Sequence, residues 1–188
     1  LNDIIQSIRP TALIGISGQA NAFSKNALKL MTEINDYPLI FALSNPTSLS
    51  ECTAEDAYKW TKGKCLFASG SPFDSVEIAG KTFIPGQGNN AYIFPGIGLG
   101  IILSQAEVIS DDLFLIAAET LSDLVSEEEL SSGQLYPSLK NIRKVSKAIA
   151  IATAKKAFSE GLTNLAMPKD IESSLDNIIY NPMYPDYI

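Results

Sequence analysis

Two adjacent asparagines beside glycine-rich turns carry the clearest chemical signal in this sequence. Asn89 and Asn90 follow Gly88 in the segment 83–96, which joins a strand-like run to an apolar, helix-like run. Glycine lets the backbone approach a ligand closely, and each asparagine amide offers two neutral N–H donors and one acceptor. Such a pair can hold a carboxylate or a carboxamide without adding charge. The plainer alternative is a turn, because Gly and Asn form turns for backbone reasons alone.

Small polar residues also follow three apolar runs, at the point where each run ends. They are the dipeptides Ser17-Gly18, Ser44-Asn45 and Ser69-Gly70. If the runs are parallel strands, their carboxyl ends meet at one edge of the sheet, where ligands of open α/β sheets bind. We therefore expect a ligand crevice at this edge, with simple chain turning as the alternative.

The apolar runs that precede these dipeptides read as buried strands. Residues 11–17, 38–43 and 64–68 are mostly apolar, which is typical of parallel strands covered on both faces. The two intervening segments have helical periodicity and an N-cap residue: 26–34 after Ser24 and 54–61 after Thr53. This strand–helix–strand–helix–strand order predicts an α/β fold that contains half of a doubly wound parallel sheet.

The second half of the sequence reads as helical. A hairpin is expected at 76–84, before the chain turns helical after Asn90. An amphipathic helix is expected at 111–125, followed by a capping box at Ser126. A long helix is expected at 141–159, and Gly161 after it is the residue type typical of the C′ position.

Composition excludes several classes of function. The chain has 188 residues, a formal net charge of −7 and no histidine. The acidic balance argues against nucleic acid or an anionic membrane surface as a partner. Without histidine, Ser-His-Asp catalysis and histidine-ligated metal are excluded within this chain. Cys52 and Cys65 fit reduced thiols in an intracellular protein. The longest apolar run, 91–103, is shorter than the about 20 residues that span a bilayer.

Several segments resemble the C-terminal part of malic enzymes in their order, their spacing and the identity of their residues. The resemblance runs from about Arg9 to about Gly161. The segments that carry it are Phe41-Ala42-Leu43-Ser44-Asn45-Pro46-Thr47, Ser50-Glu51-Cys52-Thr53-Ala54-Glu55-Asp56-Ala57-Tyr58, Cys65-Leu66-Phe67-Ala68-Ser69-Gly70-Ser71-Pro72-Phe73, Pro85-Gly86-Gln87-Gly88-Asn89-Asn90, Leu135-Tyr136-Pro137 and Ile142-Arg143-Lys144-Val145-Ser146. Where this chain departs from many relatives is at 19–21, in the first cofactor loop.

The resemblance implies a cofactor site and part of a substrate site. The positions that match the nicotinamide-cofactor loops are Ile16, Ser17, Gly18, Leu43, Ser44, Asn45, Gly70 and Asn90. The positions that match malate contacts are Asn45, Asn89 and Asn90. No catalytic residue and no metal ligand is assigned in this chain, since the family's tyrosine acid, lysine base and three carboxylates lie upstream of the matching region.

The resemblance also implies the organisation of the chain. Residues 1–90 match a partial NAD(P)-binding domain, the second half of a Rossmann-type sheet. Residues 91–162 match a helical segment of the substrate domain, and residues 163–188 are a C-terminal tail. We expect this tail to form an oligomer contact, with packing on its own domain as the alternative. The chain begins at Leu1 rather than at methionine, so we expect the parent's N-terminus to lie upstream.

The implied function is that of an NAD(P)-dependent malic enzyme, which converts malate to pyruvate and CO2. NAD or NADP would be the cofactor, with Mg²⁺ or Mn²⁺ bound by residues outside this chain. The expected partners are malate, pyruvate and further copies in a dimer or tetramer. The expected location is the cytoplasm, with the mitochondrial matrix as the alternative. Alternative functions are a malolactic enzyme and a non-catalytic dinucleotide-binding or oligomerisation module.

Overall fold

The computed structural model describes residues 1–180 and 182–183, which form two compact units. Unit 1 comprises Leu1–Asn89 and Val125–Pro137. Unit 2 comprises Asn90–Leu124 and Ser138–Ile188. The sequence gives no sign that residues 125–137 return to unit 1. The functional domain boundaries expected at residues 90 and 162 stay predictions.

A four-stranded parallel sheet is the centre of unit 1. Its order is β1 (Ala12–Gly15), β2 (Leu39–Ala42), β3 (Leu66–Ser69) and β6 (Gly86–Gln87). The register pairs Gly15 with Ala42 and Ala42 with Ser69, so the first three strands end level with one another. The predicted α/β fold with a parallel sheet is confirmed.

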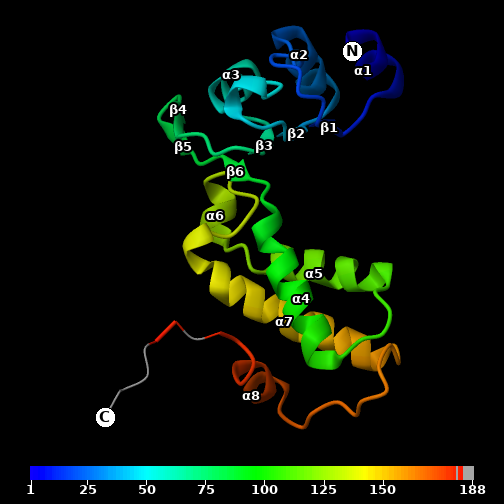
Figure 1. Cartoon of the computed structure of the whole chain (residues 1–188). Helices are drawn as coiled ribbons and strands as arrows, with labels where there is room; N and C mark the ends of the chain where they lie inside the picture. Colours follow the sequence, from blue (N-terminus) through cyan, green and yellow to red (C-terminus); the bar gives the residue numbers. More distant parts are fainter. Residues whose placement is uncertain (181, 184–188) are drawn as a thin grey trace. The chain divides into compact units, whose positions relative to one another are not determined.

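Three helices cover one face of this sheet in Figure 1: α1 (Asn2–Ile8), α2 (Lys25–Ile34) and α3 (Ala54–Trp60). Helices α2 and α3 begin where the sequence predicts caps. The Ser24 hydroxyl accepts from the Ala27 N–H at 3.3 Å, and the Thr53 hydroxyl accepts from the Asp56 N–H at 3.1 Å. Each bond satisfies a donor that the first helical turn leaves without a backbone partner.

The core of unit 1 lies between these helices and the sheet. It includes the fully buried side chains of Leu28, Met31, Ile40, Tyr58 and Phe67. The prediction that the first strand is buried on both faces is wrong, because Ile14 is 57% exposed. β1 is an edge strand, and the helices of unit 1 cover the face opposite Ile14.

The predicted hairpin is present as β4 (Val76–Ile78) paired antiparallel with β5 (Lys81–Phe83). A short helix, α6 (Glu127–Ser131), lies in the returning segment, and Ser126 caps it with Glu129 in the predicted capping box. The segment then joins the sheet region, where the Ile84 N–H donates to the Ser132 carbonyl at 2.9 Å.

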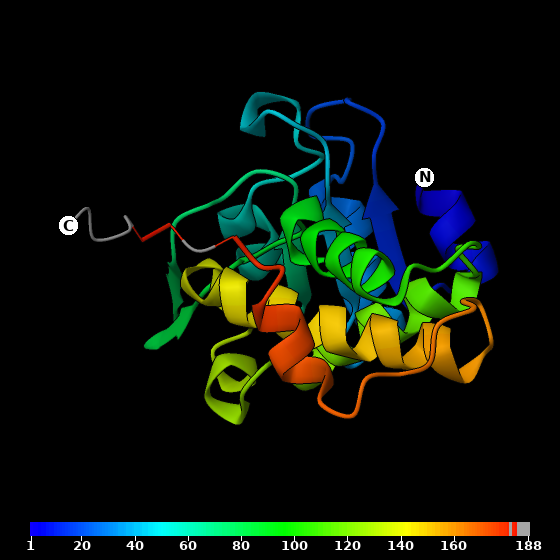
Figure 2. The ribbon, with the colours of Figure 1, turned by 60° about the horizontal axis from the view of Figure 1, so that its bottom comes forward.

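Unit 2 is helical, as predicted. Its elements are η2 (Asn90–Tyr92), α4 (Phe94–Ser104), α5 (Asp111–Asp123), η3 (Leu139–Asn141), α7 (Ile142–Ser159) and α8 (Ile171–Asp176). The long helix α7 packs against α4, α5 and α8 (Figure 2). It ends before Gly161, whose φ of +68° is the left-handed conformation expected of a C′ glycine.

Glycine allows α4 and α7 to approach closely. A Cβ atom on Gly96 would lie 2.6 Å from the Ile149 Cβ, and a Cβ on Gly100 would lie 2.7 Å from the Ala150 carbonyl oxygen. Both distances are too short for real atoms, so a larger residue at either position would force the helices apart.

The segment predicted as a tail, 163–188, contains α8, and turn and bend residues follow it at 177–179. Tyr180 and Met183 are 80% and 75% exposed. The rest of the proposed contact segment, residue 181 and residues 184–188, lies outside the described residues. Among the described residues, no helix has both the length and the apolar character that crossing a bilayer requires.

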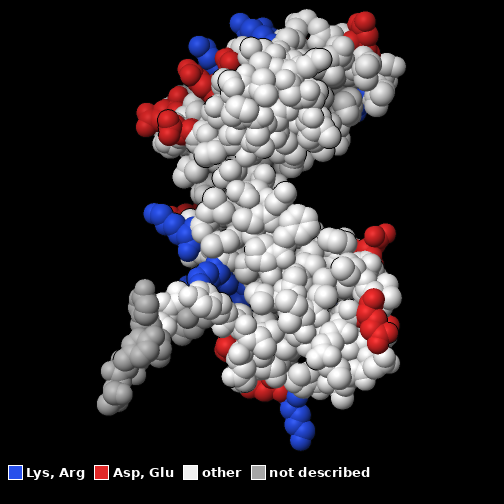
Figure 3. All heavy atoms as spheres, in the orientation of Figure 1, with Lys and Arg blue, Asp and Glu red and all other residues white. Residues whose placement is uncertain are grey.

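Charged side chains form small groups of both signs on the face shown in Figure 3, separated by wide uncharged areas. That the chain binds neither nucleic acid nor an anionic membrane surface remains a prediction.

Candidate functional site

The candidate site is the sheet edge at which β1, β2 and β3 end. The three strands are parallel and end level, so the dipeptides Ser17-Gly18, Ser44-Asn45 and Ser69-Gly70 follow them at the same edge. The structure therefore brings together the polar strand ends that the sequence predicts to form a crevice. Their role in binding a ligand remains a prediction.

Glu51 joins the first two loops, and sequence reasoning did not assign it a role. The side chain is completely buried. It accepts from the Ser17 N–H at 3.1 Å and from the Ser44 hydroxyl at 2.5 Å. Longer contacts of 3.4 Å come from the Ser17 hydroxyl and the Ser44 N–H. One carboxylate thus holds the ends of two strands.

The sequence does contain a signal for Glu51. It is the one charged residue between Asp36 and Glu55, within a segment rich in apolar and small residues. A single acid in such surroundings is unusual for a solvated surface loop, since buried charges need compensating partners. Composition alone does not identify those partners, because they follow strands that lie far apart in the sequence.

Hydrogen bonds keep this carboxylate ionised. Burial would raise the pKa of the Glu51 carboxyl, but the bonds from Ser44 and Ser17 together outweigh burial and lower that pKa below its ordinary value. Among the described residues, Glu51 belongs to none of the ion pairs. Its charge is therefore compensated by neutral donors.

The loops after β2 and β3 are also in contact. The Ser71 hydroxyl donates to the Asn45 side-chain oxygen at 2.6 Å. A Cβ atom on Gly70 would overlap the Leu43 carbonyl oxygen and would lie 2.8 Å from the Asn45 side-chain oxygen. Gly70 is therefore needed for the two loops to approach.

The bond to Ser71 decides which way the Asn45 amide faces. With its oxygen directed to Ser71, the amide presents its N–H donors elsewhere, and Asn45 is exposed. An exposed neutral donor at this edge is suited to a carboxylate ligand.

The two asparagines of the glycine-rich segment fall on either side of the boundary between the units. Asn89 is half-buried and follows β6, whose parallel pairing with β3 directs its carboxyl end toward the same sheet edge. Asn90 is exposed and begins η2 in unit 2. The structure places Asn89 with the loops of unit 1.

The remaining predicted cofactor residues differ in exposure. Ile16 is 79% exposed, and Ser17 and Gly18 are also exposed, whereas Ser44 is only 7% exposed. Gly18 has a φ of +68°, with open space where a Cβ would lie. These loops thus offer an accessible apolar side chain and an accessible backbone turn, and their role in binding the cofactor remains a prediction.

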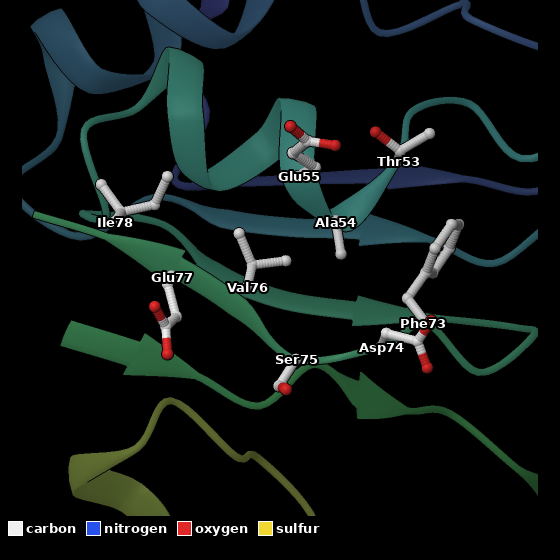
Figure 4. Close-up of a pocket in the computed structure, with 9 residues that line it drawn as sticks. All are labelled: Thr53, Ala54, Glu55, Phe73, Asp74, Ser75, Val76, Glu77 and Ile78. Atoms are coloured by element: carbon white, nitrogen blue, oxygen red, sulfur yellow. The ribbon is translucent and has the colours of Figure 1, made fainter. Parts of the chain in front are cut away.

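A cavity of about 440 Å³ lies elsewhere in unit 1, between the start of α3 and the β4–β5 hairpin. Figure 4 shows its lining, which includes the acidic residues Glu55, Asp74 and Glu77. None of the predicted site residues lines it. The strand-end loops, where the polar groups converge, are therefore the better candidate.

The cysteines are part of the core. Cys52 and Cys65 are free and buried, and burial raises the pKa of the Cys65 thiol to about 11. A neutral buried thiol is a poor nucleophile. Within residues 1–180 and 182–183, no group of three or more His, Cys, Asp or Glu side chains could hold a metal ion. The resemblance places the ligands of the divalent metal outside this chain, and that assignment remains a prediction.

Comparison with known proteins gives a consistent result. A family profile described as "Malic enzyme, NAD binding domain" matches residues 1–158. The chain is 50% identical over 188 residues to the chloroplastic NADP-dependent malic enzyme of Oryza sativa subsp. japonica, and 51% identical over 188 residues to the NADP-dependent malic enzyme of Populus trichocarpa. Both matches span the whole of this chain, but only 29% of the rice protein and 32% of the Populus protein.

Two solved structures have a similar fold. The malic enzyme of Pyrococcus horikoshii Ot3 superposes with a TM-score of 0.67 at 24% identity, covering 89% of this chain and 34% of that one. The malic enzyme of Entamoeba histolytica superposes with a TM-score of 0.70 at 20% identity, covering 89% and 31%. At these identities the two structures support the fold.

Proposed function

Because this chain belongs to the malic enzyme family through its NAD-binding domain, we propose that it is part of a longer enzyme that converts malate to pyruvate and CO2 with NAD or NADP. The observation that carries this proposal is the 50% identity to the rice enzyme along all 188 residues. The plant relatives are named NADP-dependent, which favours NADP.

Unit 1 supplies all but one of the residues that line the nicotinamide half of the cofactor site in this proposal. Ile16, Ser17, Gly18, Leu43, Ser44, Asn45, Gly70 and Asn90 would line it. When bound, the nicotinamide accepts a hydride from C2 of malate. The exposed backbone turn at Gly18 and the apolar side chain of Ile16 suit the ring.

Malate would be oriented by neutral amides. Asn45 and Asn89 donate to its carboxylates, and Asn90 completes the region between substrate and nicotinamide. The Ser71 bond supports this role for Asn45, because it directs the amide oxygen to Ser71 and leaves the N–H donors facing away from that hydroxyl. Fixing the substrate in this way lowers the entropic part of the reaction barrier.

The acid, the base and the ligands of Mg²⁺ or Mn²⁺ would come from residues outside this chain. The domain boundaries at residues 90 and 162 belong to the same proposal. The parent would act in the cytoplasm as a dimer or tetramer, with residues 163–188 contributing to the contact between copies. The rice relative, by contrast, is named chloroplastic.

The test is a malate-dependent assay of the full-length parent with Mn²⁺, monitoring reduced cofactor at 340 nm and analysing the products. We expect pyruvate and NADPH in equal amounts. Lactate without net cofactor reduction would instead identify a malolactic enzyme, and dinucleotide binding without turnover would identify a binding module. The 188-residue chain alone is expected to be inactive, so turnover by it would refute the assignment of the catalytic groups to other residues.

A further inference from the structure

Burying the Glu51 carboxylate costs free energy, and the need to form the fold does not by itself explain why a charge is there. A fully buried carboxylate is expensive unless its oxygens are well paired. Here the pairing comes from two serines that follow two different strands, not from a cation. A loop that only had to turn could dispense with the charge.

The sheet is shaped to admit this side chain. A Cβ atom on Gly15 would lie 2.5 Å from the Cγ and Cδ of Glu51 and 2.8 Å from the Phe23 ring. Only glycine leaves this room at the last position of β1. The backbone around Glu51 is also fixed to the first loop, since the Phe23 N–H donates to the Glu51 carbonyl at 2.9 Å.

Ser44 transmits the position of the carboxylate to the exposed turn. Its hydroxyl donates to Glu51 and accepts from the Gly18 N–H at 2.8 Å. A hydroxyl has one proton, so donation to Glu51 leaves its lone pairs to accept from Gly18. The chain of bonds runs from the buried charge through Ser44 to the Gly18 backbone.

We propose that Glu51 is a positioning residue of the cofactor site, whose carboxylate fixes the Ser17-Gly18 turn through Ser44 in the shape that binds the nicotinamide half of the dinucleotide. This inference rests on the proposed function and names a residue that acts on ligand affinity without touching the ligand. Removing the charge loosens the first loop and leaves the core of unit 1 in place.

The test uses full-length parent enzyme with Glu51→Gln, and with Glu33→Gln on the exposed surface of α2 as the matched control. NADPH affinity is measured by fluorescence titration, malate KM at saturating cofactor, and folding by circular dichroism. We expect Glu51→Gln to raise the NADPH Kd about tenfold, the effect of losing one hydrogen bond to a charged group. Malate KM should change less than twofold, and Glu33→Gln should change neither.

A second pair of variants covers the case in which Glu51→Gln does not fold. Ser44→Ala breaks the connection to Gly18 and should raise the NADPH Kd, whereas Ser44→Thr keeps the hydroxyl and should restore affinity. Where Glu51→Gln does fold, combining it with Ser44→Ala should change the NADPH Kd non-additively, because the two residues form one bond chain. Unchanged NADPH affinity in folded Glu51→Gln, or in Ser44→Ala, would overturn the inference. Failure of the wild-type parent to bind NADPH would instead refute the proposed function.

Discussion

Unit 1 and unit 2 differ in their buried polar residues and in the contacts that hold their elements together. In unit 1 the buried polar residues include a charge, and the hydrogen bonds of Glu51 join segments that are 34 and 7 residues away in sequence. Among the described residues of unit 2 the buried polar ones are the hydroxyl-bearing Ser104, Ser146 and Thr153, and close contacts are made by Gly96 and Gly100. One unit is organised by directional bonds at a sheet edge, and the other by the fit of helix surfaces.

This difference predicts that the two units respond differently to substitution. Helices that touch through glycine tolerate little added volume, since protein interiors are close-packed. Loops held by hydrogen bonds to a buried charge can shift while the sheet beneath them stays intact. We therefore expect substitutions in unit 2 to lower stability and substitutions at the edge of unit 1 to lower ligand affinity.

The largest effect should come from Gly100→Val in unit 2. The added side chain meets the Ala150 carbonyl oxygen and the Thr153 side chain, and the backbone oxygen cannot turn away. We expect the free energy of unfolding to fall by about 3 kcal/mol. Gly98→Ala in the same helix is the control, because a Cβ there meets no atom within 4 Å, and it should stabilise by about 0.5–1 kcal/mol. Equal melting temperatures for the two variants would remove the contrast between the units.

The next effect concerns ligand affinity at unit 1. Asn45→Ala and Asn89→Ala in the parent should each cost about 1.5–3 kcal/mol in kcat/KM for malate, the value of a hydrogen bond to a charged group. The melting temperature of Asn45→Ala should stay close to that of the wild type, because Asn45 is exposed. Steady-state kinetics measures the fall in kcat/KM, and calorimetry on the same samples measures the melting temperature. Wild-type malate kinetics in both variants would contradict the substrate assignment.

Acid should affect the bond chain of unit 1 more than unit 2. The pKa of Glu51 is lower in the folded state than its ordinary value of 4.5, so its ionised form stabilises the fold above that value. This contribution is lost as the pH falls through the folded pKa. The stability difference between wild type and Glu51→Gln should therefore be constant at neutral pH and shrink as the protein is acidified below the ordinary value. Melting curves at several pH values measure this, and a difference that grows on acidification would have the wrong sign.

The smallest effect should come from the surface of unit 2. Lys147 and Asp176 form an ion pair of 2.6 Å between α7 and α8, but both side chains remain substantially exposed. Exposed pairs contribute little because water and salt screen them. Asp176→Asn should leave the melting temperature unchanged within the error of the measurement. A clear loss would mean that α8 depends on this charge pair.

Local signals in the sequence predicted much of the fold. The caps at Ser24, Thr53 and Ser126 and the end of α7 near Gly161 each depend on residues within a few positions of one another. The parallel sheet followed from the order of apolar and amphipathic segments. The strand-end loops of the candidate site followed from that sheet, because parallel strands end at one edge.

Features that depend on distant residues were harder to predict. The exposure of Ile14 depends on which elements cover the second face of β1. The role of Glu51 depends on Ser17, which precedes it by 34 residues, and on the room left by Gly15. The return of residues 125–137 to unit 1 depends on contacts with β5 and β6 that no periodicity encodes.

The returning segment 125–137 determines where a gene can be cut if unit 1 is to be produced without unit 2. A shortened gene that stops after codon 89 would encode the sheet but would omit the Ser132 carbonyl that accepts from Ile84. It would also omit Tyr136, whose ring would lie 3.2 Å from a Cβ on Gly86 in β6. β6 would then lose its cover, and Ile84, two residues before it, would lose its backbone partner, so we expect such a product to be prone to proteolysis at residues 84–89. Adding residues 125–137 through a short linker should protect that stretch. A gene for unit 1 must therefore join two separate parts of the sequence.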